Sequence, residues 1–428
     1  MTTARGRVPD GLRERAPRAE RRLSKKPIPS RLGLVCAGGG VTGAIYQMGT
    51  LAAIEDRLED SSLNDFQVFV GVSAGSYIAA LLANGVTPGV LYRTVTRPPS
   101  TITIDELALF KLNASEIASR LATAPITLLD AAWDFYKNRR ETTLTDLVVS
   151  LGQILPSGIF LNDGLEEWIA KWLVHPDRTN DFRTLSKVLR IVAVELDTGE
   201  TRVFGSPGYD DVSIARAVRA SCTIPGLYRP VKIHDKEYID GGVQKTAHVS
   251  LALEERCGLV VCVNPIVPIR FPATVPAANG NGAQGPLARR GLPTILDQVF
   301  RVTLHSRMRY GMQRYRRDNP DADIVLFEPR PDELPRFMRG SIMRTSGRAR
   351  IAEYAYRSTM ARLDEDFPRL SRVFARHGLR LSPRAPETSR TVRNAELFQL
   401  LATGDMPTRL AASLETLEME LDRAAAGH

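Results

Sequence analysis

The sequence has few cysteines and no long apolar run. Its 428 residues include four cysteines, and Cys36, Cys257 and Cys262 lie in or beside apolar stretches. Free cysteine in such surroundings behaves as a small core residue, and the spacing contains no paired CxxC zinc signature. We therefore predict reduced thiols and a cytoplasmic location. Because no run of 18 apolar residues is present, we expect no membrane-spanning helix.

Histidine is also scarce, with six residues in the chain. They form neither an HExxH pair nor a cluster with cysteine, so we predict no metal site and no resident cofactor. The amino terminus lacks the apolar stretch of a secretory signal. What remains is the composition of a globular protein, with 43% hydrophobic and 25% charged residues.

Positive charge is concentrated at the amino terminus. The formal net charge is +9, and residues 1–31 carry ten Lys or Arg against three acidic residues. Such a tail cannot bury enough apolar surface to fold alone, so we predict that it is disordered. It is either a solubilising leader or a segment that transiently contacts an anionic membrane surface, which would make the protein peripheral to the membrane. We expect no nucleic-acid partner.

Apolar strands alternate with helical patterns, which predicts a largely parallel α/β sheet. We expect one main domain over residues 32–330, with a helical cap at about 103–175 and a flexible insertion at about 271–291. A helical carboxyl-terminal extension follows at 331–428, with helices at 343–376 and 393–424. The apolar residues of the cap either form its core or line an apolar groove. Further predictions are an Arg-ended helix at 293–317 and strands at 32–37, 67–70, 189–195, 259–264 and 324–328.

A glycine-rich loop follows the first predicted strand. Gly38, Gly40 and Gly43 have the GxGxxG spacing of a dinucleotide-binding loop. Such a site needs an acidic residue at the end of the second strand, but Asp65 precedes that strand and Ser73 ends it. This position disfavours a nucleotide. A glycine turn at a helix amino terminus still presents several N–H groups to some other anion.

Two further motifs carry chemistry. "GVSAG" at 71–75 lies between an apolar strand and a helical pattern, which is the context of a nucleophile elbow that exposes Ser73. "DGG" at 240–242 is either an ordinary turn or a turn that holds Asp240 as a base.

In this order, "GGGVTG" at 38–43, "GVSAG" and "DGG" resemble the patatin-like phospholipase family. "ELDTGETRVF" at 195–204 and "AVRASCTIPGLYRPV" at 217–231 support the resemblance, which covers about residues 32–330. It implies a three-layer α/β/α patatin-like (lysophospholipase-like) sheet. It also implies a serine lipid acyl hydrolase of phospholipase A, lysophospholipase or carboxylesterase type, acting on a lipid or acyl-ester substrate without a cofactor.

The resemblance also implies roles for single residues. Ser73 would be the nucleophile and Asp240 the base of a dyad without histidine. The backbone amides of Gly38, Gly39, Gly40 and Val41 would form the oxyanion hole. The remaining motif glycines would shape the turns, namely Gly43, Gly71, Gly75, Gly241 and Gly242.

The sequence departs from the family at Thr42, where relatives usually carry Arg or Lys. Two other functions stay open at this point. One is a catalytically silent lipid-binding protein on the same fold. The other is an α/β-hydrolase with a Ser-His-Asp triad, although His305 and His377 lack the expected loop context and His248 only follows Asp240 closely. Water and an alcohol are both open as acyl acceptors, and the sequence predicts no oligomeric state.

Overall fold

The computed structural model describes residues 31–96, 110–137, 155–270, 291–330 and 347–384. The basic tail up to residue 30, residues 271–290 of the expected insertion and the helix expected at 393–424 lie outside these ranges. So do residues 97–102, and residues 103–109 and 138–154 of the expected cap region.

A mixed eight-stranded sheet forms the centre of the molecule, in the order β12-β11-β1-β3-β6-β10-β9 with β7 paired to β6. The five strands from β12 to β6 are parallel, whereas β10, β9 and β7 run antiparallel to their neighbours. The five parallel strands are the five that the sequence predicts, each within two residues of the expected ends. They are β1 (Arg31–Cys36), β3 (Val68–Val72), β6 (Val188–Glu195), β11 (Cys257–Val263) and β12 (Asp323–Phe327); the others are β7 (Thr201–Phe204), β9 (Val231–Ile233) and β10 (Lys236–Asp240).

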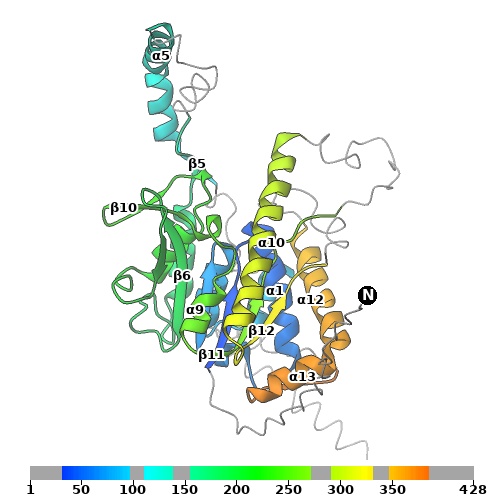
Figure 1. Ribbon diagram of the computed structural model, residues 1–428. Coiled ribbons are helices and arrows are strands. Elements are labelled where there is room, and N and C mark those ends of the chain that lie inside the picture. Colours follow the sequence, from blue (N-terminus) through cyan, green and yellow to red (C-terminus); the bar gives the residue numbers. More distant parts are fainter. Residues whose placement is uncertain (1–30, 97–109, 138–154, 271–290, 331–346, 385–428) are drawn as a thin grey trace, which may run out of the picture.

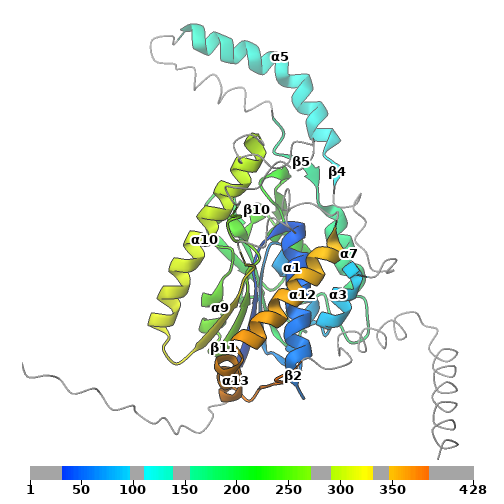
Figure 2. The ribbon, with the colours of Figure 1, turned by 90° about the vertical axis from the view of Figure 1, so that its right-hand side faces the viewer.

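Helices cover both faces of this sheet (Figures 1 and 2), so the three-layer prediction is confirmed. Because side chains alternate along a strand, Leu34 and Cys36 of β1 join one buried cluster while Val35 and the following Ala37 join another. The first cluster includes residues of α1 (Gly40–Arg57), α2 (Ala74–Ala83), α3 (Pro88–Thr96), α7 (Asp163–Leu173), α8 (Ile214–Ser221), α12 (Arg348–Glu365) and α13 (Phe367–Arg376). The second includes residues of α9 (Val249–Glu254) and α10 (Leu292–Asp318).

Two segments that the sequence places in a cap behave differently. α7 packs against α8 and buries Ile169 and Leu173 in the main core. α5 (Ala114–Lys137) instead projects from the body (Figure 1). A small sheet at its base joins β4 (Lys111–Leu112), β5 (Gly158–Leu161) and β8 (Gly226–Tyr228).

The predicted helices at 343–376 are present as α12 and α13. α12 lies against α1, where a methyl group on Gly49 would overlap the carbonyl of Ala352. The short strand β13 (Arg380–Leu381) then pairs with β2 (Leu58–Glu59), which directly follows α1. Within the described ranges, no helix has both the length and the apolar composition needed to cross a bilayer.

Candidate active site

Ser73 lies at a sharp corner between β3 and α2. Its backbone angles are φ 52° and ψ −131°, close to the first corner of a type II′ turn that glycine usually occupies. The turn is held because the Ser73 carbonyl accepts hydrogen bonds from the N–H of Ser76 at 2.8 Å and from its hydroxyl at 2.6 Å. Gly75 permits it, since a methyl group there would overlap the carbonyl of Cys36. The strained corner directs the Ser73 side chain away from the regular helix.

Ser221, at the end of α8, fastens this corner to the next strand. The N–H of Ser73 donates to the Ser221 hydroxyl at 2.9 Å, and that hydroxyl donates to the carbonyl of Val192 on β6 at 2.6 Å. Ser221 is fully buried. The hydroxyl therefore bridges the backbone of Ser73 and the sheet.

Asp240 ends β10 at the same level of the sheet as Ser73. The register pairs Asp240 with Ala193, while the neighbouring Val192 pairs with Val72. The Asp240 carboxylate accepts a hydrogen bond from the N–H of Gly242 at 2.7 Å, and the Ser73 side chain lies close enough to it to favour its ionised form. The structure thus brings together two residues that lie far apart in the sequence.

The backbone of Asp240 is held by the segment that holds Ser73. Its N–H donates to the carbonyl of Thr223 at 2.8 Å. The Thr223 hydroxyl is itself fixed, because it donates to the carbonyl of Arg219 at 2.8 Å and accepts from the side chain of Asn162 at 3.0 Å. Residues 221 and 223 therefore position the two members of the Ser73–Asp240 pair.

Burial sets the protonation of Asp240. Removal from water raises the pKa of its carboxyl group to about 6, although the Ser73 side chain and the hydrogen bond from Gly242 act in the opposite direction. A carboxylate of ordinary pKa, about 3.9, is a weak base for a hydroxyl group. The raised pKa brings Asp240 closer to the range in which a general base works efficiently near neutral pH.

The glycine loop lies directly against Ser73. A Cβ atom added to Gly38 would stand 3.2 Å from the Cβ of Ser73. The N–H of Gly38 is engaged, since it donates to the carbonyl of Thr246 at 2.8 Å. The amides of Gly39, Gly40 and Val41 stand where α1 begins, and N–H groups at a helix start have no carbonyl partner within the helix. These amides can face an anion, and the helix dipole adds to the attraction.

The sequence-predicted site residues are brought together in the described structure. Ser73 contacts Asp240, the Gly38 loop adjoins Ser73, and Gly242 donates to Asp240. Thr42 is a buried residue of α1. Sequence reasoning did not identify Ser221 and Thr223 as functional, although both lie in "AVRASCTIPGLYRPV", because only the fold shows which backbone groups their polar atoms reach.

His305 and His377 pair with carboxylates other than Asp240. His305 lies 3.8 Å from the Glu328 carboxylate and His377 lies 2.9 Å from that of Asp323. Burial lowers the pKa of His248 to about 3, with a smaller contribution from Lys245.

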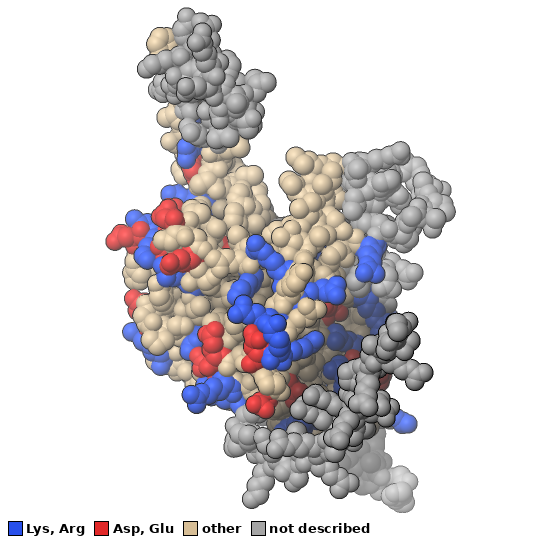
Figure 3. Space-filling view, in the orientation of Figure 1, with Lys and Arg blue, Asp and Glu red and all other residues tan. Residues whose placement is uncertain are grey.

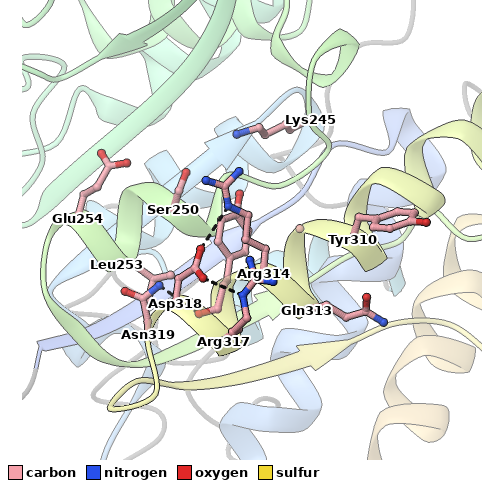
Figure 4. Close-up of a pocket in the computed structure, with 12 residues that line it drawn as sticks. Lys245, Ser250, Leu253, Glu254, Tyr310, Gln313, Arg314, Arg317, Asp318 and Asn319 are labelled. Atoms are coloured by element: carbon pink, nitrogen blue, oxygen red, sulfur yellow. Dashed lines mark hydrogen bonds and ion pairs between the residues drawn. The ribbon is translucent and has the colours of Figure 1, made fainter.

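Three cavities lined by described residues do not include Ser73 in their lining. One of them, of about 1040 Å³, lies between α9 and the carboxyl-terminal half of α10 (Figure 4). Asp318 stands there between Arg314 and Arg317 and accepts a hydrogen bond from each, at 3.2 and 3.1 Å. The other two have volumes of about 700 and 270 Å³. No group of three or more His, Cys, Asp or Glu residues suited to a metal occurs in the described ranges.

Comparison with known proteins gives a family match and several relatives. The model of the family described as patatin-like phospholipase matches residues 34–253. The chain is 26% identical over 233 residues to "Uncharacterized protein YqhO" of Bacillus subtilis (strain 168), covering 52% of this chain and 67% of that protein. It is 24% identical over 221 residues to "Probable lipid hydrolase 463L" of Invertebrate iridescent virus 6, covering 52% of this chain and 63% of the viral protein, which is less than two thirds of its length. Among solved structures it is similar to VipD from Legionella pneumophila, with a TM-score of 0.34, 15% identity, and coverage of 79% of this chain and 67% of that one.

Proposed function

This chain belongs to the patatin-like phospholipase family, and from that premise we propose that it is a serine lipid acyl hydrolase that uses a Ser73–Asp240 dyad. The observation that carries the proposal is the approach of the Ser73 side chain to a buried Asp240, whose pKa burial raises to about 6. It places a nucleophile beside a base, which is the arrangement that nucleophilic catalysis requires.

In the proposed first step, the Ser73 oxygen attacks the carbonyl carbon of an acyl ester while Asp240 takes the hydroxyl proton. The tetrahedral intermediate collapses, the alcohol leaves with that proton, and an acyl-enzyme remains on Ser73. Asp240 then takes a proton from water, which attacks the acyl-enzyme. The carboxylic acid leaves, and the proton returns from Asp240 to the Ser73 oxygen.

The negative charge of each tetrahedral intermediate is placed on the glycine loop. We propose the amides of Gly39, Gly40 and Val41 as its donors, because the N–H of Gly38 already serves Thr246. A preorganised donor of this kind is commonly worth about 10²–10³ in rate. A backbone hole needs no basic side chain, so Thr42 at the family's basic position is compatible with it.

The surroundings of the histidines support a dyad over a triad. His305 and His377 face Glu328 and Asp323, and neither of these carboxylates is Asp240. The protonated form of His248 is strongly disfavoured by burial, which is opposite to what an imidazolium-forming catalyst needs.

The proposal is tested with a fluorophosphonate probe and a short p-nitrophenyl ester. The parent protein is expected to be labelled and to release p-nitrophenol, and Ser73→Ala to do neither. Ser206→Ala, on the turn after β7, is the matched control and is expected to behave as the parent. Full labelling of Ser73→Ala would show that another residue is the nucleophile. A folded parent that neither reacts nor turns over would instead favour a catalytically silent lipid-binding protein.

A further inference from the structure

α10 is divided along its length into an apolar tip and a basic half. In the tip, residues 292–302, only Arg301 is buried among the described side chains. From Leu304 onward the helix is anchored, because Leu304, Met308 and Met312 are buried at helical spacing. The tip therefore extends beyond the body of the protein (Figures 1 and 2). Its exposed large apolar residues are Leu292, Ile295, Leu296, Val299, Phe300 and Val302.

Three polar side chains of the tip contact one another or the body of the protein. Asp297 is paired with the Nε of Arg301 at 2.9 Å. Arg301 itself is buried, and its two Nη atoms have no hydrogen-bond partner among the described residues. The side chain of Gln298 accepts from the N–H of Ile269 at 3.1 Å and donates to its carbonyl at 2.9 Å. The exposed face of the tip is therefore mainly apolar.

The other half of α10 is positively charged. It carries five arginines, at positions 307, 309, 314, 316 and 317, and one acidic residue, Asp318. All five arginines are exposed. Figure 3 shows Lys and Arg gathered over the lower part of this face, below the uncharged projecting end. An exposed apolar patch marks an interaction site, and the adjoining charge indicates an anionic partner.

The tip begins beside the proposed oxyanion loop. Pro265 packs against Gly39 and Gly43, so that a Cβ atom on Gly43 would stand 2.9 Å from its ring. Four residues later, Ile269 is held by Gln298 of α10. This short segment connects the end of β11, the glycine loop and the tip. A surface that binds the tip would therefore lie near the Ser73 site.

We propose that α10 docks on an anionic phospholipid bilayer, with its tip among the acyl chains and Arg307 and Arg309 at the head groups. At 1.5 Å per residue, Leu292 to Val302 spans about 15 Å, which is half of a hydrocarbon core about 30 Å thick. Arg307 follows after about 7.5 Å, at head-group depth. α5 projects from the same end of the molecule (Figure 1) and exposes Leu121, Leu129 and Trp133, which makes it a second contact. The inference rests on the proposed function in that the bilayer supplies the acyl-ester substrate.

The test measures vesicle flotation of full-length Ser73→Ala protein, which cannot alter the lipids during the experiment. Binding to vesicles of phosphatidylglycerol and phosphatidylcholine is expected. Adding Leu296→Ser and Val299→Ser is expected to weaken it at least tenfold, whereas adding Val174→Ser, an exposed valine after α7, leaves it unchanged. Adding Arg307→Gln and Arg309→Gln is expected to weaken it about 30-fold, from about 1 kcal/mol per basic residue. Arg369→Gln with Arg372→Gln on α13, at the other end of the molecule, is the charge control.

Unchanged flotation of the Leu296→Ser and Val299→Ser protein would overturn the proposal. Equal binding to vesicles of pure phosphatidylcholine would overturn the role of the arginines. If these two substitutions instead convert a lipid-free dimer to a monomer and leave flotation unchanged, the tip is a contact between two copies of the chain. With Ser73 intact, the tip variants are expected to keep parental hydrolysis of a soluble ester, so this result is independent of whether the dyad assignment holds.

Discussion

The hydroxyl of Ser221 accepts a hydrogen bond from the N–H of Ser73 at 2.9 Å and donates one to the carbonyl of Val192 at 2.6 Å. A buried side chain from α8 thus connects the nucleophile corner to β6. If the Ser221 hydroxyl is removed, the buried N–H of Ser73 and the buried carbonyl of Val192 lose their hydrogen-bond partner, which costs about 1–3 kcal/mol. The link also fixes the position of Ser73 relative to Asp240, because β10 pairs with β6.

We expect Ser221→Ala to lower the free energy of unfolding by about 1–3 kcal/mol. We also expect it to reduce kcat while KM changes little. A small misplacement of the nucleophile impairs the chemical step, whereas the substrate contacts stay intact. Urea unfolding and ester kinetics measure the two effects, and Ser221→Thr, which keeps the hydroxyl, is the rescue variant. A loss of stability with an unchanged kcat would show that Ser221 has only a structural role.

Asp240 is expected to make the active protein less stable at neutral pH than an uncharged equivalent. Its pKa is about 6 in the folded protein and about 3.9 in the unfolded chain, so the folded state binds the proton more tightly. Stability therefore falls as pH rises from about 4 to about 6 and stays lower above that. We expect Asp240→Asn to abolish turnover and to raise the unfolding free energy by about 1–3 kcal/mol at pH 8, with a smaller gain at pH 5.

Urea unfolding at the two pH values measures this difference. Asp235→Asn, at a fully exposed aspartate of the preceding turn, is the control and is expected to show no pH-dependent gain. An Asp240→Asn protein with parental turnover, or one that is equally destabilised at both pH values, would contradict the assignment of Asp240 as a buried base.

The same carboxyl group sets the pH dependence of hydrolysis. Asp240 accepts a proton only when it is ionised, so kcat/KM on a soluble ester is expected to fall about tenfold per unit as pH drops below about 6. His305→Asn is expected to leave this profile unchanged, because His305 lies beside Glu328. A profile that His305→Asn abolishes would favour a histidine base.

Some parts of this site follow from local sequence signals, whereas others depend on the tertiary fold. The five parallel strands and the three glycine-containing motifs are local signals, because apolar runs, strand-to-helix junctions and glycine turns depend on consecutive residues. The contact between Ser73 and Asp240 depends on the pairing of β3, β6 and β10, and the motif order indicated it only through resemblance to a family. The Ser221 bridge could not be predicted, since a serine in a helix gives no sign of which backbone group it will meet.

α10 shows the same division between local and tertiary information. The sequence predicted the helix within one residue at each end, and it showed the arginines at the end of the helix. It could not show that the first turns extend beyond the body, because that depends on where Leu304, Met308 and Met312 are anchored. From the sequence alone, these arginines are compatible with an ordinary solvated helix face and with a head-group or partner surface.

The backbone of Ser73 provides the last prediction. With φ at 52°, Ser73 adopts a conformation that costs a residue with a side chain about 1 kcal/mol or more and that glycine adopts freely. Ser73→Ala and Ser73→Gly both remove the hydroxyl that lies beside Asp240, so their difference isolates the backbone. We expect Ser73→Gly to be more stable than Ser73→Ala by about 1 kcal/mol in urea unfolding. At Ser206, where φ is not positive, the order is expected to reverse, because glycine there only adds freedom to the unfolded chain. Equal stability of Ser73→Gly and Ser73→Ala would show that the corner stores no strain.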